Sequence, residues 1–248
     1  MKSLWFVVPA YRRFELTAIC LRQLRRTCDA LDDNGIRASA VVVADDNNLT
    51  TARDLGFATV ERANHATSQK FNDGIQLACD PAFNPRPVDY VVPCGSDDWV
   101  DWRLFTELPP SGTMVGFQRM AFVREDGFEL TVRHLNLEGG CGVRIYPRDV
   151  MAKVGYRPAD EDRRRACDTS ILVNLKLADA VRVVHRDLDP LQIVDWKSPH
   201  DQLNPYATVA VRHRSELNRD PFDVLAGRFP DESLDEMAAH YARAAVAA

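Results

Sequence analysis

Three short polar stretches each follow directly after a run of apolar residues. They are Pro9-Ala10-Tyr11-Arg12, Asp45-Asp46-Asn47-Asn48 and Gly95-Ser96-Asp97-Asp98. If the apolar runs are parallel strands of one sheet, their carboxyl ends meet at one edge, where α/β proteins bind ligands. Four carboxylates gathered there would repel one another unless a cation or hydrogen-bond donors offset their charge. Carboxylate oxygens suit Mg2+ or Mn2+, so the pattern predicts a divalent-metal site.

Each acidic stretch also has a simpler interpretation. Aspartate and asparagine are common in turns and at helix N-caps, and one such stretch taken alone would favour that role. Three stretches that follow three strands in succession favour a shared site.

The first half of the sequence predicts alternating strands and helices that would position these stretches. We expect strands over 4–8, 38–44, 58–61 and 89–93, with helices over 14–31 and 68–78. Continuous apolar strands are typical of a parallel sheet that is buried on both faces. Ser68 is placed to cap the second helix. This order predicts an α/β fold, with a mostly parallel central sheet flanked by helices.

The second half predicts a different arrangement. We expect a hairpin of strands over 113–123 and 128–133, further strands over 143–146 and 181–185, and helices over 147–154, 168–177 and 231–247. The last of these is alanine-rich, and its larger side chains recur at helical spacing, which predicts a terminal helix packed on the body.

Composition narrows the function classes. The 248 residues are 46% hydrophobic with a net charge of -5, and only five of the 31 basic residues are lysines. The arginines are scattered, as codon bias in a GC-rich genome would produce, and the lack of a basic run argues against duplex nucleic-acid binding. No apolar run is long enough to span a membrane. Six cysteines without metal-site spacing predict reduced thiols and a cytoplasmic protein.

The strings VVPAYRR, VVVADDNN and YVVPCGSDDWVD, in this order and spacing, resemble the donor half of family-2 glycosyltransferases of the GT-A fold. The likeness covers about residues 3–105 and, more weakly, 139–180. It implies transfer of a sugar from a nucleotide-sugar, UDP-linked, to an acceptor hydroxyl, with Mn2+ or Mg2+. It also implies one GT-A-like domain over 1–248, with a donor half (1–108), an acceptor and catalytic half (109–230) and a C-terminal helix (231–248). The acceptor is not indicated.

The resemblance assigns donor-side roles to particular residues. Donor-binding positions are Pro9, Tyr11, Arg12, Asp46, Lys70, Asn72, Ser96 and Asp97. Asp46 would accept a hydrogen bond from the base, and Asp98, with Asp97 beside it, would hold the metal ion. Lys70 matches the family's basic position, although an exposed helix lysine is an equal alternative. His185 is a further candidate metal ligand, with an ordinary surface histidine as its alternative.

The same resemblance places Asp168 where the family has its catalytic aspartate. Inverting transfer needs a carboxylate that takes the acceptor's proton, which Asp168 would do. Its alternative role is a helix cap, and both roles are compatible. The chain departs from the family pattern at Gly95, where an acid often stands, and at Cys167, which replaces a glutamate.

Two other functions stay open on the sequence. A sugar-phosphate nucleotidyltransferase would need a glycine-rich G-x-G-x-R signature after the first strand, where this chain has PAYRR. A non-catalytic binder of nucleotide-sugars or glycans would be consistent with the departures at Gly95 and Cys167. P-loop and dinucleotide-binding functions are excluded because their glycine motifs are missing.

Overall fold

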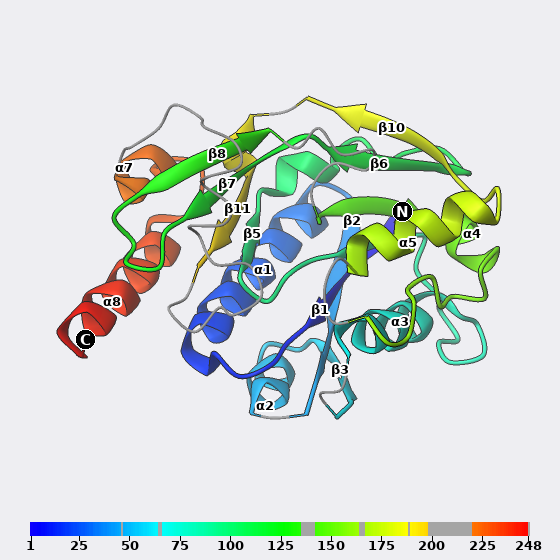
Figure 1. Ribbon diagram of the computed structural model, residues 1–248, viewed down its shortest axis with the longest axis horizontal. Helices are drawn as coiled ribbons and strands as arrows, with labels where there is room; N and C mark the ends of the chain where they lie inside the picture. Colours follow the sequence, from blue (N-terminus) through cyan, green and yellow to red (C-terminus); the bar gives the residue numbers. More distant parts are fainter. Residues whose placement is uncertain are drawn as a thin grey trace.

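In the part of the chain that the structure describes, seven strands form the main sheet (Figure 1). The computed structural model describes residues 1–45, 47–63, 66–134, 142–163, 167–187, 189–197 and 220–247. The strand order is β10 (Arg182–Arg186), β6 (Thr113–Phe117), β9 (Arg144–Pro147), β4 (Tyr90–Pro93), β1 (Lys2–Pro9), β2 (Ile36–Ala44) and β3 (Ala58–Glu61). Strand β9 is antiparallel to both neighbours, and the other pairs are parallel.

Helices cover both faces of this sheet because its central strands are apolar on both sides. Phe6 of β1 packs with α1 (Phe14–Asp33), α2 (Asn48–Asp54) and the 3-10 helix η1 (Trp102–Phe105). Val7, which points the opposite way, packs with α3 (Thr67–Cys79), α4 (Arg148–Ala152) and α5 (Cys167–Leu177). The predicted α/β architecture with a mostly parallel sheet is confirmed.

A second, smaller sheet packs on the other side of α1. It consists of β5 (Asp98–Val100), β11 (Ile193–Trp196), β7 (Arg119–Val123) and β8 (Leu130–His134), and the 3-10 helix η2 (Pro190–Gln192) leads into β11. Trp99 and Trp196 stack edge-on with ring centroids 4.8 Å apart. The helices α7 (Pro221–Leu225) and α8 (Asp231–Ala247) close this core, at the end of the molecule opposite α4 and α5 (Figure 1).

Two local predictions were wrong. The strand expected over 113–123 is two strands, β6 and β7, which belong to different sheets. Both are buried, so the apolar run continues across the break at Gln118 and hides it. Ser68 does not cap α3, which starts at Thr67; its hydroxyl donates instead to the carbonyls of Glu161 and Arg163, at 3.0 and 2.9 Å.

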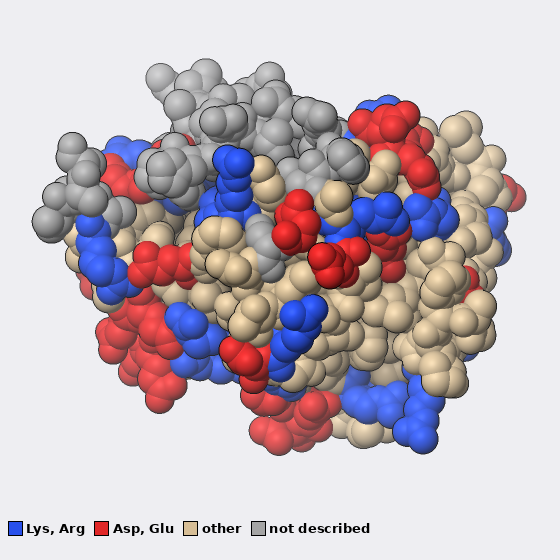
Figure 2. Space-filling view, turned by 90° about the horizontal axis from the view of Figure 1, so that it is seen from below, with Lys and Arg blue, Asp and Glu red and all other residues tan. Residues whose placement is uncertain are grey.

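The surface and the helices agree with the charge and hydropathy of the sequence. On the face seen in Figure 2, acidic and basic side chains are interspersed in small groups. Among the described residues, none of the helices has both the length and the apolar character needed to cross a membrane.

Candidate metal and donor site

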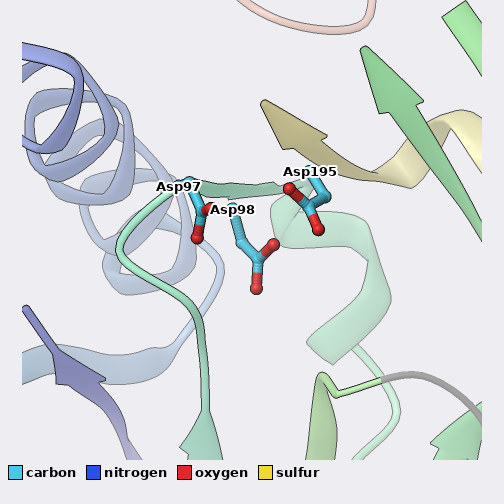
Figure 3. Close-up of side chains that lie close together, drawn as sticks. All are labelled: Asp97, Asp98 and Asp195. Atoms are coloured by element: carbon cyan, nitrogen blue, oxygen red, sulfur yellow. The ribbon is translucent and has the colours of Figure 1, made fainter. Parts of the chain in front are cut away.

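Three aspartates lie together where the two sheets meet (Figure 3). Asp97 and Asp98 stand at the start of β5, after β4 has ended at Pro93. Asp195 lies in β11, directly opposite Asp98 in the antiparallel pairing of these strands. One oxygen from each carboxylate lies within 4.8 Å of the others. We call this group, Asp97, Asp98 and Asp195, the carboxylate triad.

Gly95 explains how the triad is built. Its backbone N–H donates to Oδ2 of Asp98 at 2.7 Å. A Cβ at this position would lie 2.7 Å from Asp98 Oδ2 and 2.8 Å from Asp97 Oδ1, which is closer than atoms can approach. An acid at position 95, as the resembling family often has, would therefore displace both carboxylates. Here the third carboxylate comes from Asp195 of the facing strand.

Two cations of the described chain each contact one carboxylate of the triad. Arg13 Nη1 lies 2.7 Å from Asp97 Oδ2, and Lys197 Nζ lies 2.6 Å from Asp195 Oδ2. Burial would raise the pKa of Asp97, but the charges of Arg13 and Lys197 outweigh it and hold that pKa below its usual value. Burial, and then the like charges of Asp195 and Asp97, raise the pKa of Asp98 well above its usual value.

The triad fits a divalent ion by its chemistry. Its donors are hard carboxylate oxygens, the ligands that Mg2+ and Mn2+ prefer, and they are close enough to share one ion. The ionised form of Asp98 is disfavoured because the carboxyl is buried and two like charges stand beside it. A bound cation would remove that repulsion.

The end of β1 carries the predicted donor residues. Pro9 ends the strand, and the ring of Tyr11 is 39% exposed. Lys70 is buried, 1% exposed, and donates from Nζ to the carbonyl of Ala10 at 2.7 Å. Its ammonium also lies 5.4 Å from the centroid of the Tyr11 ring, and the Arg12 guanidinium stands 4.9 Å from the same ring. The alternative of an exposed helix lysine is therefore wrong, and Lys70 supports the loop that presents Tyr11.

Two other predicted donor residues, Ser96 and Asn72, have different surroundings. Ser96 is buried and accepts a hydrogen bond from Arg13 Nη2 at 3.1 Å, beside the triad. The amide of Asn72 is fully buried and exchanges two hydrogen bonds with the backbone of Ala159, of 2.8 and 2.9 Å. That side chain fixes the segment after α4 against α3. Asp46 lies outside the described residues.

Asp168 is held by a buried arginine. It lies in the first turn of α5, which begins one residue earlier, at Cys167. Arg144, whose side chain is 2% exposed, contacts Asp168 Oδ2 from Nη2 at 3.2 Å and donates from Nη1 to the Asp168 carbonyl. The Asp168 side chain is 32% exposed. Burial, and then the charge of Asp168, raise the pKa of the Cys167 thiol to about 11.

Strand register places Asp168 at the same edge of the main sheet as the triad. Val91 of β4 pairs with Tyr146 of the antiparallel β9, so Arg144 falls beside the end of β4. From that end the chain continues to Gly95 and the triad. His185 also lies at this edge, in β10 opposite Gly116 of β6. Among the described residues the acidic group does not include His185, and its role as a metal ligand stays a prediction.

Four charged residues at this edge were not predicted from the sequence: Arg13, Arg144, Asp195 and Lys197. Asp195 stands in the apolar run Ile193–Trp196, where an acid is unusual enough to be noticed. Lys197 is one of only five lysines in the chain. The pairing of Asp195 with Asp98, about a hundred positions away, and of Arg13 with Asp97, 84 positions away, was not readable from the sequence.

Comparisons with known proteins give a fold. No protein-family model matches the sequence, and no curated protein matches it. Solved structures do, among them a mutant Drosophila β1,4-galactosyltransferase 7 in complex with manganese, UDP-Gal and xylobiose, with a TM-score of 0.51 at 13% identity over 95% of this chain and 84% of that one. The chain has the GT-A fold.

Glucosyl-3-phosphoglycerate synthase from Mycobacterium tuberculosis supports the same GT-A assignment. Its complex with Mn2+, UDP-Glc and phosphoglyceric acid matches with a TM-score of 0.52 at 14% identity, covering 85% of this chain and 79% of that one. A complex of that enzyme with Mg2+ and UDP matches with a TM-score of 0.52 at 12% identity, covering 86% and 79%. The GT-A-type fold predicted from the three sequence strings is confirmed.

Proposed function

We propose that the protein is a metal-dependent glycosyltransferase that moves a sugar from a nucleotide-sugar, UDP-linked, to an acceptor hydroxyl. The observation that carries this proposal is the carboxylate triad, at the edge of a GT-A sheet where α/β proteins bind ligands. The neighbours of the same fold were solved with UDP or UDP-sugars and with Mn2+ or Mg2+, which supports the choice of donor and ion.

The donor side follows from the loop after β1 and from the triad. The half-exposed ring of Tyr11, supported by Lys70, is suited to stack on the base. The triad would hold a divalent ion, which when bound offsets the negative charge that grows on the leaving diphosphate. Ser96, beside the triad, and Asp97, one of its members, are suited to the ribose or to ion-bound water.

Asp168 is the proposed general base. Its Oδ2 contacts Arg144, so the carboxylate is held in one orientation and Oδ1 is the oxygen that would face the acceptor. The acceptor oxygen forms a bond to the anomeric carbon as the bond from that carbon to the diphosphate oxygen breaks. The acceptor's proton passes to Asp168, and the nucleoside diphosphate leaves with the bonding electron pair. This displacement inverts the anomeric centre.

A panel of nucleotides tests the proposal. Isothermal titration of UDP, GDP, ADP and CDP should show one nucleotide, UDP, that binds in the presence of Mn2+ and at least tenfold more weakly in EDTA. The variant Asp98→Asn should lose the Mn2+-dependent part of that affinity. A chain that binds none of these nucleotides, with or without Mn2+, would contradict the proposal.

One observation favours a non-catalytic binder as the second candidate. Cys167, whose thiol is buried and protonated at neutral pH, stands where the resembling family has a glutamate. Release of free sugar from UDP-Glc or UDP-Gal without an acceptor separates the two candidates, because a binder would leave the nucleotide-sugar intact.

We further propose that this chemistry takes place in the cytoplasm. Five cysteines of the described part of the chain are free thiols and buried, as is usual for structural cysteines in a reducing compartment. The burial of two of them, Cys28 and Cys79, raises their pKa values to about 12.

A further inference from the structure

The loop between β1 and α1 places Arg13 in contact with the carboxylate triad. Arg12 and Arg13 both have left-handed backbone conformations, with φ of 54° and 48°. Residues other than glycine adopt this conformation at a cost, and two in succession persist only where their surroundings hold them. The next residue, Phe14, begins the 20-residue helix α1, so the strained turn fixes where the helix starts.

Contacts from other elements hold this turn. Asn48 Nδ2 donates to the carbonyl of Arg12 at 3.1 Å. The Arg13 guanidinium donates from Nη1 to Asp97 Oδ2 at 2.7 Å and from Nη2 to Ser96 Oγ at 3.1 Å. The backbone strain is thus tied to the position of one guanidinium at the triad.

Arg13 and Lys197 differ in what they can reach. The Lys197 side chain is only 2% exposed and is enclosed with Asp195 and the ring of Phe122. The Arg13 side chain is 20% exposed, ten times the exposed fraction of Lys197, and its guanidinium contacts the triad. Its planar fork of N–H donors matches phosphate oxygens well.

The charges have opposite consequences for an ion and for a diphosphate. Three carboxylates with two fixed cations leave a formal charge of about −1, which attracts a divalent ion less than three free carboxylates would. A nucleoside diphosphate brings additional negative charge, which a guanidinium next to the ion stabilises. The same side chain should therefore oppose binding of the ion alone and favour binding of the diphosphate.

We propose that Arg13 is a diphosphate-binding residue that shares Asp97 with the divalent ion. Without nucleotide it occupies Asp97 Oδ2 and weakens binding of the ion; with nucleotide it donates to the diphosphate while the triad holds the ion. This inference rests on the proposed function, because it takes the ligand to be a nucleoside diphosphate.

The proposal predicts opposite changes in the affinities for Mn2+ and for UDP when Arg13 is replaced. In the variant Arg13→Gln, titration with Mn2+ alone should show affinity about threefold to tenfold tighter than in wild type, because Asp97 loses its competing cation. Titration with UDP at saturating Mn2+ should show affinity at least about tenfold weaker, because a charge-assisted contact is lost. Arg13→Lys keeps the charge without the fork and should lie between wild type and Arg13→Gln in UDP affinity.

Arg22→Gln is the matched control. Arg22 lies on α1, the helix that follows Arg13. Its replacement removes a similar ion pair, the 2.7 Å contact with Glu236, away from the triad. Both affinities should match those of wild type. If Arg13→Gln binds UDP as tightly as wild type, or loses Mn2+ and UDP affinity together as a misfolded site would, the assignment of Arg13 is overturned while the proposed function stands. A wild-type chain that binds no nucleotide overturns both.

Discussion

Replacing Asp98 with asparagine is expected to stabilise the metal-free protein while removing its response to manganese. The side chains are almost the same shape, and the asparagine oxygen can keep the hydrogen bond from the Gly95 N–H. What changes is the charge. Asp98 has two carboxylate neighbours within 4.8 Å, and one such pair at an effective dielectric constant of 20 costs about 3.5 kcal/mol.

Arg13 and Lys197 offset most of this repulsion, since each contacts one of the neighbouring carboxylates. We expect a remaining cost of about 2 kcal/mol, which Asp98→Asn recovers. Taking up a proton would relieve the repulsion in wild type, but protonation itself costs free energy at neutral pH, so the variant gains in either case.

Thermal unfolding measures both effects. In EDTA the variant should unfold roughly 4–8 °C above wild type, the shift that about 2 kcal/mol produces in a chain of this size. Mn2+ at about 100 times its Kd should stabilise wild type by about 2.7 kcal/mol and leave the variant unchanged. Asp235→Asn, at an exposed position of α8, serves as the control for losing one negative charge. If the variant is less stable than wild type in EDTA, the idea that Asp97 and Asp195 repel the Asp98 carboxylate is refuted.

The structure supports four further predictions. Asp168→Asn should lower the transfer rate at least about 1,000-fold while UDP affinity in Mn2+ stays within about twofold, as measured by product assay and titration; full turnover would exclude it as the base. Gly95→Ala should weaken Mn2+ binding at least about tenfold in the same titration, because its Cβ would meet Asp98 Oδ2 at 2.7 Å, and unchanged affinity would show that the turn can yield. Burial raises the pKa of Glu236, but hydrogen bonds from Arg22 and Arg26 lower it by more, so Glu236→Gln should cost about 0.5 kcal/mol at pH 7. The arginines stabilise only the ionised form of Glu236, so the stability difference between wild type and Glu236→Gln should vanish in unfolding titrations as the pH falls below about 4. A difference that persists at pH 3 would show that Glu236 stabilises the fold through packing instead. Cys167, whose pKa is about 11, should react with iodoacetamide at pH 8 at least about tenfold more slowly than in the unfolded chain, as followed by peptide mass spectrometry, and equal rates would contradict its burial.

The main sheet was predictable because its strands and helices each have a recognisable pattern within their own stretch of sequence. Strand β3 and helix α8 have the bounds expected from the sequence, and β1, β2 and α1 differ by only one to two residues at their ends. Their apolar runs and helical spacing are strong signals over many residues. In contrast, β5 and β11 have three and four residues, and each includes an aspartate, so neither is a continuous apolar run. The hairpin of β7 and β8 was expected, but the two strands that complete the site were therefore missed.

The site was predictable only where its residues follow apolar strands of the main sheet. Asp97 and Asp98 could be placed after β4 because the end of that strand is visible in the sequence. Asp195 joins them through a pairing between strands about a hundred residues apart, and no local pattern records that register. Arg13 reaches Asp97 because of a left-handed backbone, a conformation that arginine rarely adopts and that the sequence does not indicate.

The role of Gly95, where the chain departs from the family pattern, becomes clear only in the structure. In the sequence it is a position where the resembling family often has an acid. In the structure its lack of a side chain makes room for Asp97 and Asp98, and its N–H holds one of them. The departure therefore belongs to the way this chain builds its triad.

The most direct test of the central claim is a crystal structure with Mn2+ and UDP, read through the anomalous signal of manganese. The account predicts one strong peak within about 2.0–2.3 Å of an Asp98 oxygen, in contact with the UDP diphosphate, with Asp97 or Asp195 beside it. A nucleotide that binds elsewhere, or a triad that carries no manganese when nucleotide is present, would contradict it.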